Sequence, residues 1–185
     1  MAGQMHFTEI AKFNSTVDDL KIDKNNNVYV KSDSKIYKCL AGQMNFTEII
    51  GIAGHINVWA VDDKSGDLYA SSKDDDILYK CLAGQTVFKQ LIEFKSTSWR
   101  DSNIGDLTID KSGNIFVRAR AENGPWRLFK CETGQTVFEQ MLLPIGVSCD
   151  NISLIVGNND TLYINFRGTL YKSEKFVNLL NKVGN

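Results

Sequence analysis

The chain has 185 residues, enough for one well-buried core. Its 21 Lys and Arg residues balance 22 Asp and Glu residues, so no net charge favours nucleic acid or an anionic membrane as a partner. No apolar run approaches the roughly 18 to 20 residues that cross a bilayer, and residues 1–15 have neither the basic start nor the apolar core typical of a secretion signal. We expect a soluble protein without membrane insertion. The missing secretion signal and the free cysteines favour the cytoplasm, and secretion is the alternative if a leader was removed before Met1.

Two sequence blocks recur four times along the chain. The first block pairs Gly-Gln with a downstream Phe and begins at Gly3, Gly42, Gly84 and Gly134. The second is a turn followed by an apolar-aromatic-Lys strand, which ends at Cys39, Cys81, Cys131 and Ser173. Such self-similarity predicts a repeat architecture. We expect a single domain over 1–185, with repeats at about 3–41, 42–83, 84–133 and 134–175 and a tail at 176–185.

Each repeat predicts four short strands, most clearly in the second repeat. There the apolar alternation predicts strands over 46–50, 57–62, 68–71 and 77–81. Segments rich in Gly and Asn follow the second predicted strand of each repeat and predict hairpin turns with positive φ, at 24–27, 63–66, 111–114 and 157–160. The chain is therefore expected to be almost wholly antiparallel β.

Units of about 40 to 45 residues with four strands are typical of β-propeller blades. We predict an all-β fold, a single small β-propeller with four blades of four antiparallel strands. The N-terminal strand at 4–10 is expected to close the ring beside the last blade. Residues 176–180 could be a fifth opening strand or part of a short C-terminal helix, and a larger propeller built from two chains stays open. The third repeat carries insertions at 95–103 and 121–125.

Three of the four cysteines occupy the same place in successive repeats. Neighbouring copies of Cys39, Cys81 and Cys131 should lie beyond the roughly 7 Å between Cα atoms that a disulfide allows. They are predicted to be small buried apolar residues, and Ser173 at the fourth position agrees with that role. Free thiols favour a reducing compartment.

Short motifs at 63–80, 110–130 and 158–172 share the pattern Asp-Lys-x-Gly-x-Leu/Ile-Tyr/Phe followed by Leu-Tyr-Lys, in weaker form in the last. This pattern resembles the blades of tachylectin-2-type β-propeller lectins. The resemblance implies binding of N-acetylated sugars at several equivalent sites. Residues 58–62 are similar to tectonin repeats, another group with lectin members, whereas residues 20–23 with 28–30 resemble NHL repeats, which bind proteins or RNA.

The ionisable residues offer little for catalysis. His6 and His55 are the only histidines, and His6 matches Asn45, Val87 and Val137 in the other repeats. Since no partner is signalled for either histidine, we predict no enzyme and no catalytic residue. Asp74 to Asp76, and Asp62, Asp63 and Asp67, lack the spacing of an EF-hand and are predicted to be hairpin tips, so we expect no metal and no cofactor.

Sugar binding needs an aromatic face and nearby amide, carboxylate or guanidinium groups. The candidates are Asn57, Trp59, Asp62, Trp99, Asp101, Asn103, Asn123, Trp126 and Arg127. Trp59, matched to Lys21, Thr108 and approximately Leu154, could equally pack between blades, so Trp99 and Trp126 in the third-repeat insertions are the better ligand candidates. The recurring Gly-Gln pair could be a turn whose amide satisfies backbone groups, or a ligand anchor.

The recurring aromatic residues predict packing between blades. They are Tyr29, Tyr69, Phe116 and Tyr163 in one set, and Tyr37, Tyr79, Phe129 and Tyr171 in the other. We predict a non-enzymatic, lectin-like carbohydrate-binding module with several weak equivalent sites, which binds glycans or glycoproteins. The alternative is a protein-interaction scaffold that uses the third-repeat loops around Trp99 and Trp126.

Overall fold

The computed structural model describes residues 8–73, 75, 77–94, 103–120, 125–143, 146–150, 152–157 and 160–173. Within these ranges the chain forms strands β1 to β15 and no helix, which confirms the all-β class. The first sheet contains β1 (Val17–Ile22), β2 (Val28–Ser32), β3 (Lys35–Cys39) and β4 (Thr47–Ile49). The second contains β5 (Ile56–Val61), β6 (Leu68–Ser72), β7 (Ile77–Cys81) and β8 (Lys89–Glu93).

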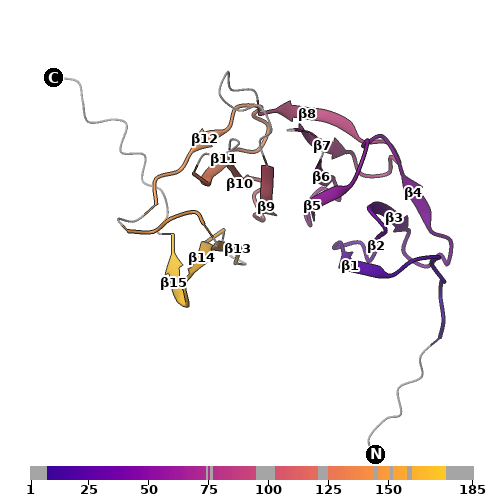
Figure 1. The fold of residues 1–185 in the computed structure, drawn as a ribbon. Helices are drawn as coiled ribbons and strands as arrows, with labels where there is room; N and C mark the ends of the chain where they lie inside the picture. Colours follow the sequence, from indigo (N-terminus) through magenta and orange to yellow (C-terminus); the bar gives the residue numbers. More distant parts are fainter. Residues whose placement is uncertain are drawn as a thin grey trace, which may run out of the picture.

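The third and fourth sheets repeat this order. The third contains β9 (Asn103–Ile109), β10 (Ile115–Arg120), β11 (Arg127–Cys131) and β12 (Glu139–Gln140). The fourth contains three described strands, β13 (Ile152–Val156), β14 (Leu162–Phe166) and β15 (Thr169–Lys172). All strand pairs are antiparallel, and the four sheets follow one another around an arc with β1, β5, β9 and β13 on its inner side (Figure 1).

The predicted strands of the second repeat are confirmed, but the structure groups them differently. The strand at 46–50 appears as β4, which pairs with β3 through Ile36↔Ile49 and Lys38↔Thr47. It therefore completes the first sheet and does not begin the second. Each sheet of the structure is offset by one strand from the repeat in the sequence.

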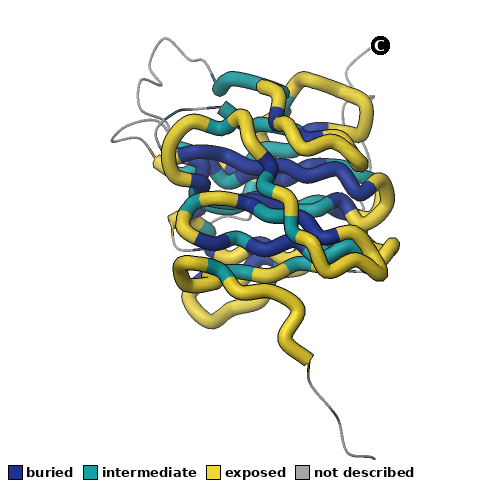
Figure 2. Tube along the Cα trace, turned by 90° about the vertical axis from the view of Figure 1, so that its right-hand side faces the viewer, coloured by how far each residue is buried: buried dark blue, intermediate teal, exposed yellow. Residues whose placement is uncertain are grey.

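Apolar clusters between neighbouring sheets hold the arc together. Tyr29 of the first sheet packs in a cluster with residues of the second, Tyr69 of the second with residues of the third, and Phe116 of the third with residues of the fourth. All three rings are buried, which confirms that they pack between sheets. The buried segments run through the middle of the sheets, while the turns at their ends are exposed (Figure 2).

The Gly-Gln pair and the recurring cysteine form one repeated local structure. Gly42, Gly84 and Gly134 have φ of 74°, 80° and 78°, as the third residue of a type II turn requires. The thiol of the preceding cysteine lies 3.2 to 3.3 Å from the backbone oxygen of the Gln in each copy. The predicted free, buried cysteines are confirmed, and burial raises the pKa of the Cys81 and Cys131 thiols. It is the Gln carbonyl that makes this recurring contact.

The first strand of each of the first three sheets is followed directly by an aspartate that organises the next turn. Asp23 Oδ1 accepts hydrogen bonds from the backbone N–H groups of Asn25 and Asn27, both at 2.9 Å. Its Oδ2 accepts from the Asn27 side chain at 2.8 Å and from the Tyr29 hydroxyl at 3.1 Å. Asp110 and Asn114 repeat this arrangement. Positive φ at Asn26, Gly66, Gly113 and Asp160 confirms the four predicted hairpin turns.

We expect the Asp23 carboxylate to make the stability of the chain depend on pH. Burial acts to raise its pKa, but the hydrogen bonds from Asn27 and Asn25 outweigh burial and hold the pKa below the ordinary 3.8. A lowered pKa in the folded state stabilises above the unfolded pKa and loses that contribution as the pH falls through the folded pKa. Urea unfolding should show stability falling below about pH 4, less steeply in Asp23→Asn. Identical pH profiles for the two proteins would contradict this role.

The ends of the chain lie largely outside the described residues, which include neither 1–7 nor 174–185. Thr8 to Ile10, the end of the predicted closing strand, form no strand, and Ile10 lies beside Met44 and Phe46 at the first sheet. Closure of the ring by the N-terminal strand therefore stays a prediction. The possible C-terminal helix also lies outside the described residues.

Candidate functional site

The strongest candidate site lies on the third sheet, on the side that faces the fourth. Arg118 and Arg120 alternate along β10 with Ala119, which is buried on the other side. Trp126 immediately precedes β11. The guanidinium carbons of Arg118 and Arg120 lie 4.3 and 4.7 Å from the centre of the Trp126 ring. We call Arg118, Arg120 and Trp126 the arginine-tryptophan cluster.

Backbone contacts fix one side of the arginine-tryptophan cluster. Arg118 donates from Nη2 to the carbonyl of Gly105 at 3.3 Å and from Nη1 to the carbonyl of Cys149 at 3.4 Å. A Cβ atom at Gly105 would lie 2.5 and 2.7 Å from two carbons of the Trp126 ring. Glycine is therefore needed at position 105 for the ring to occupy this place. Arg118 and Trp126 form a preorganised support.

Arg120 is the adaptable member of the arginine-tryptophan cluster. Within the described part of the chain its guanidinium stacks on Trp126, and its Nε atom, like that of Arg118, is buried without a hydrogen-bond partner. Arg120 and Trp126 are both half-buried residues, so part of each stays accessible. A guanidinium in this setting can bind a carboxylate through two parallel hydrogen bonds, while the ring contacts the apolar part of the same ligand.

Two predicted site residues lie at this place, and four others cannot be located there. Trp126 belongs to the cluster, and the neighbouring Arg127 is exposed, with Nη1 donating to Gln140 Oε1 at 3.1 Å. The remaining third-repeat candidates are Trp99, Asp101 and Asn123, which lie outside the described residues, and Asn103, which begins β9 but whose side chain is not described. Arg118 and Arg120 were missed, although Arg-Ala-Arg on a strand places both arginines on one side.

The other three predicted residues have partners within the fold. Trp59 is 6% exposed in the cluster between the first and second sheets, with Lys21 Nζ 4.9 Å from its ring centre. Asn57 donates from its side chain to the carbonyl of Ile104. Asp62 accepts from the backbone of Lys64 at 2.9 Å and from the hydroxyl of Ser65 at 2.6 Å. The first two of these side chains join sheets, and Asp62 closes a turn.

The predicted match of Trp59 to Lys21 and Thr108 is wrong by one residue. Trp59 pairs with Ala70, and the corresponding pairs in the first and third sheets are Leu20↔Val30 and Leu107↔Val117. Trp59 precedes Asp62 by three residues, as Leu20 precedes Asp23 and Leu107 precedes Asp110. Trp59 therefore occupies an apolar position, which accounts for its burial.

A cavity of about 530 Å³ lies between the second and third sheets. Its walls include Gln135 of a Gly-Gln pair and an ion pair in which Lys80 Nζ lies 2.7 Å from Asp67 Oδ2. Burial acts to lower the pKa of Lys80, but the hydrogen bond to Asp67 outweighs it and raises the pKa. Asp67 also accepts from the backbone of Ala83 at 2.8 Å. The Lys80 and Asp67 charges in this cavity are thus paired with each other.

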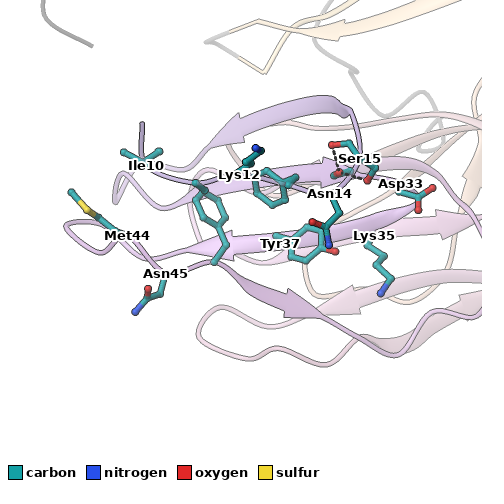
Figure 3. Close-up of a pocket in the computed structure, with 13 residues that line it drawn as sticks. Ile10, Lys12, Asn14, Ser15, Asp33, Lys35, Tyr37, Met44 and Asn45 are labelled. Carbon is teal, nitrogen blue, oxygen red and sulfur yellow. Dashed lines mark hydrogen bonds between the residues drawn. The ribbon is translucent and has the colours of Figure 1, made fainter. Parts of the chain in front are cut away.

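A larger cavity, of about 740 Å³, opens on the face of the first sheet that is turned away from the second sheet. Figure 3 shows Tyr37 and Lys35 from β3 on one side, Met44 and Asn45 from the following turn, and Ile10 and Lys12 across from them. Phe13 packs against Tyr37 and Phe46, with ring centres 5.2 and 5.3 Å apart. This cavity belongs to a face of the first sheet that no other sheet in the described part of the chain covers (Figure 1).

The residues considered for other chemistry are placed as follows. His6 lies outside the described residues, and His55 is exposed in the loop before β5. The described residues contain no group of three or more His, Cys, Asp or Glu side chains arranged to hold a metal ion. In that same part of the chain, no helix has the length and apolar character needed to span a membrane.

Comparison with known proteins identifies the fold. No protein-family model and no curated protein sequence matches the chain. Among solved structures, a putative TolB from Agrobacterium tumefaciens has a TM-score of 0.64 at 8% identity, over 88% of this chain and 60% of its own. YCF48 bound to D1 peptide has a TM-score of 0.58 at 15% identity, over 83% of this chain and 48% of its own.

A third similar structure is the extracellular domain of a putative hybrid two-component system from B. thetaiotaomicron, with a TM-score of 0.60 at 13% identity over 85% of this chain and 21% of its own. The chain thus spans less than two thirds of the length of each of these structures. None of the three supports tachylectin-2 or tectonin lectins in particular. The sheet order and these likenesses together show that the chain has a β-propeller fold.

Proposed function

We propose that the chain is a non-enzymatic protein-interaction scaffold that binds an acidic segment of a partner at the arginine-tryptophan cluster. The observation that carries the proposal is the half-buried Arg120, which lies against the Trp126 ring with no carboxylate partner in the described part of the chain. Tryptophan and arginine are the residues most enriched among those that dominate the energy of protein interfaces.

The geometry favours a polypeptide over a neutral sugar. A neutral sugar needs hydrogen-bond acceptors as well as donors, but a guanidinium group offers donors alone. Asn57 and Asp62, the predicted acceptors, are engaged within the fold. The YCF48 structure with a bound peptide is consistent with peptide binding by this fold. The hypothesis of carbohydrate binding is supported by the resemblance to lectin repeats.

The test is binding of the purified chain to arrays of short acidic, neutral and basic peptides, with a glycan array in parallel. We expect preference for acidic peptides, weakened by added salt because the contact is ionic. Arg120→Gln and Trp126→Ala should each weaken peptide binding by about 2 kcal/mol, roughly thirtyfold. Arg120→Lys should restore little, since lysine lacks the planar fork.

Lys35→Gln provides the control, because Lys35 is an exposed cation on β3 of the first sheet, where its Nζ lies 3.1 Å from Glu48 Oε1. It should leave peptide binding unchanged. Binding to N-acetylated glycans with no binding to any peptide class would contradict the proposal and support the lectin hypothesis. Equal losses from Lys35→Gln and Arg120→Gln would show a general charge effect and also contradict it.

A further inference from the structure

The first and fourth sheets each have one face that no other described sheet covers, and we call these the open faces. Within the chain, one face of each of the first three sheets packs against the next sheet, and the opposite face of each of the last three packs against the preceding one. Among the described residues, no sheet precedes the first and none follows the fourth, and these two sheets lie at the ends of the arc (Figure 1).

One repeated position, buried in the first three sheets and exposed in the fourth, identifies the open face of the fourth sheet. Leu170 is 66% exposed. Its counterparts, each followed by an aromatic residue and a lysine, are Ile36, Leu78 and Leu128, all 0% exposed. What covers these three side chains is the following sheet. Ile155, 62% exposed on the same face of the fourth sheet, has the buried counterpart Ala60 in the second sheet.

The first sheet shows the complementary exposure. Leu20 is 54% exposed, whereas its counterparts Trp59, Leu107 and Leu154 are 6%, 7% and 7% exposed against the preceding sheet. Tyr37 and Phe46, which line the cavity of Figure 3, occupy the positions of Tyr79 and Phe88. In the second sheet those two rings belong to the cluster shared with Ile36 and Ile49 of the first.

We propose that a second copy of the chain binds head to tail, with the last sheet of one copy packed on the first sheet of the other. The two open faces are complementary by construction, because each repeats a face that already finds its partner three times within the chain. Residues that are fully buried at the three internal junctions become exposed only at the ends, where burial of apolar area would favour association. In a closed pair of copies, both junctions would form and no open face would remain.

The experiment measures the mass of the purified chain by light scattering over a dilution series, for the native sequence, Leu170→Asp and Leu20→Asp. The native chain should be an oligomer of two or more copies that dissociates on dilution. Each variant buries an unpaired carboxylate at the junction, and should raise the dissociation constant on the order of a hundredfold. Because both leucines are exposed in the single chain, circular dichroism should show both variants folded.

Mixing the two variants separates head-to-tail contact from contact between identical faces. Leu170→Asp chains keep an intact first face and Leu20→Asp chains keep an intact last face, so the mixture can form one native junction. Association should therefore return on mixing. If only one variant dissociates, identical faces meet each other and the proposal is overturned.

Leu142→Asp is the matched control, because Leu142 is 89% exposed on the link after β12 and belongs to neither open face. It should leave the mass unchanged. A native chain with the mass of a single copy at all concentrations would overturn the proposal, and would show that the open faces are covered within the chain or take another protein. Peptide binding at Arg120 is independent of either result, since neither leucine contributes to that site.

Discussion

Leu128→Ala should lower the free energy of unfolding by about 2 to 5 kcal/mol, whereas Leu170→Ala should change it by less than about 0.5 kcal/mol. The two leucines stand at the same place in their repeats. Leu128 is fully buried in the cluster between the third and fourth sheets, so its truncation leaves a cavity. Leu170 projects from the uncovered face of the fourth sheet, so its truncation removes little buried area.

Both alanine variants should be made in the Leu20→Asp chain, so that association between copies does not contribute to the measured stability. Urea unfolding then gives the two free energies under the same conditions. An equal cost for the two substitutions would mean that the fourth sheet is covered within the single chain, as closure of the ring by the N-terminal strand requires. The pair of measurements therefore tests whether the arc is open.

The strands, the turns and the packing role of the cysteines could all be predicted from the sequence because the repeats supply several copies of each pattern. Positive φ at the turns follows from Gly, Asn or Asp at matched places. Serine at position 173, where the other three repeats have cysteine, argues against a metal ligand or a disulfide at this place, because either would need the sulfur. A residue that recurs at one place in the repeats, together with the residues that replace it there, indicates the physical role of that position.

The grouping of strands into sheets could not be predicted from the same patterns. β4 is joined to β3 by residues 40–46 and to β5 by residues 50–55, so the two links have nearly equal lengths. Either pairing would satisfy the alternation of β4. Its partner is decided by the register with β3, which carries Ile49 into the cluster between the first two sheets.

The candidate site was predicted in part, because its parts come together only in three dimensions. The sequence predicts Trp126 from its place in an insertion, but the position of its ring depends on the missing side chain at Gly105. The position of the Arg118 guanidinium depends on its hydrogen bond to the carbonyl of Cys149. The sequence alone predicts Asp62 as a ligand, because a carboxylate that closes a turn and one that binds a sugar have the same chemistry. The distinguishing signal was its recurrence at Asp23 and Asp110.

Gly51→Ala should lower the free energy of unfolding by about 2 to 4 kcal/mol. Gly51 has φ of 105°, which side chains of L-residues rarely allow, and a Cβ atom there would lie 2.7 Å from the backbone oxygen of Phe88. The adjoining Ile50 donates to the carbonyl of Thr86 at 2.9 Å and accepts from the N–H of Phe88 at 2.8 Å. Relief of the clash would therefore break the backbone bridge that ties the first sheet to the second.

Gly42→Ala separates the effect of the backbone angle from that of the clash. Gly42 has φ of 74°, but no atom lies within 4 Å of its added Cβ, so only the angle is unfavourable and the cost should be about 1 kcal/mol. Urea unfolding of the two variants measures the difference directly. Equal costs would show that the bridge from Ile50 to Phe88 contributes nothing to the junction. A larger cost for Gly51→Ala would mean that the first junction depends on this backbone pairing as well as on its apolar cluster.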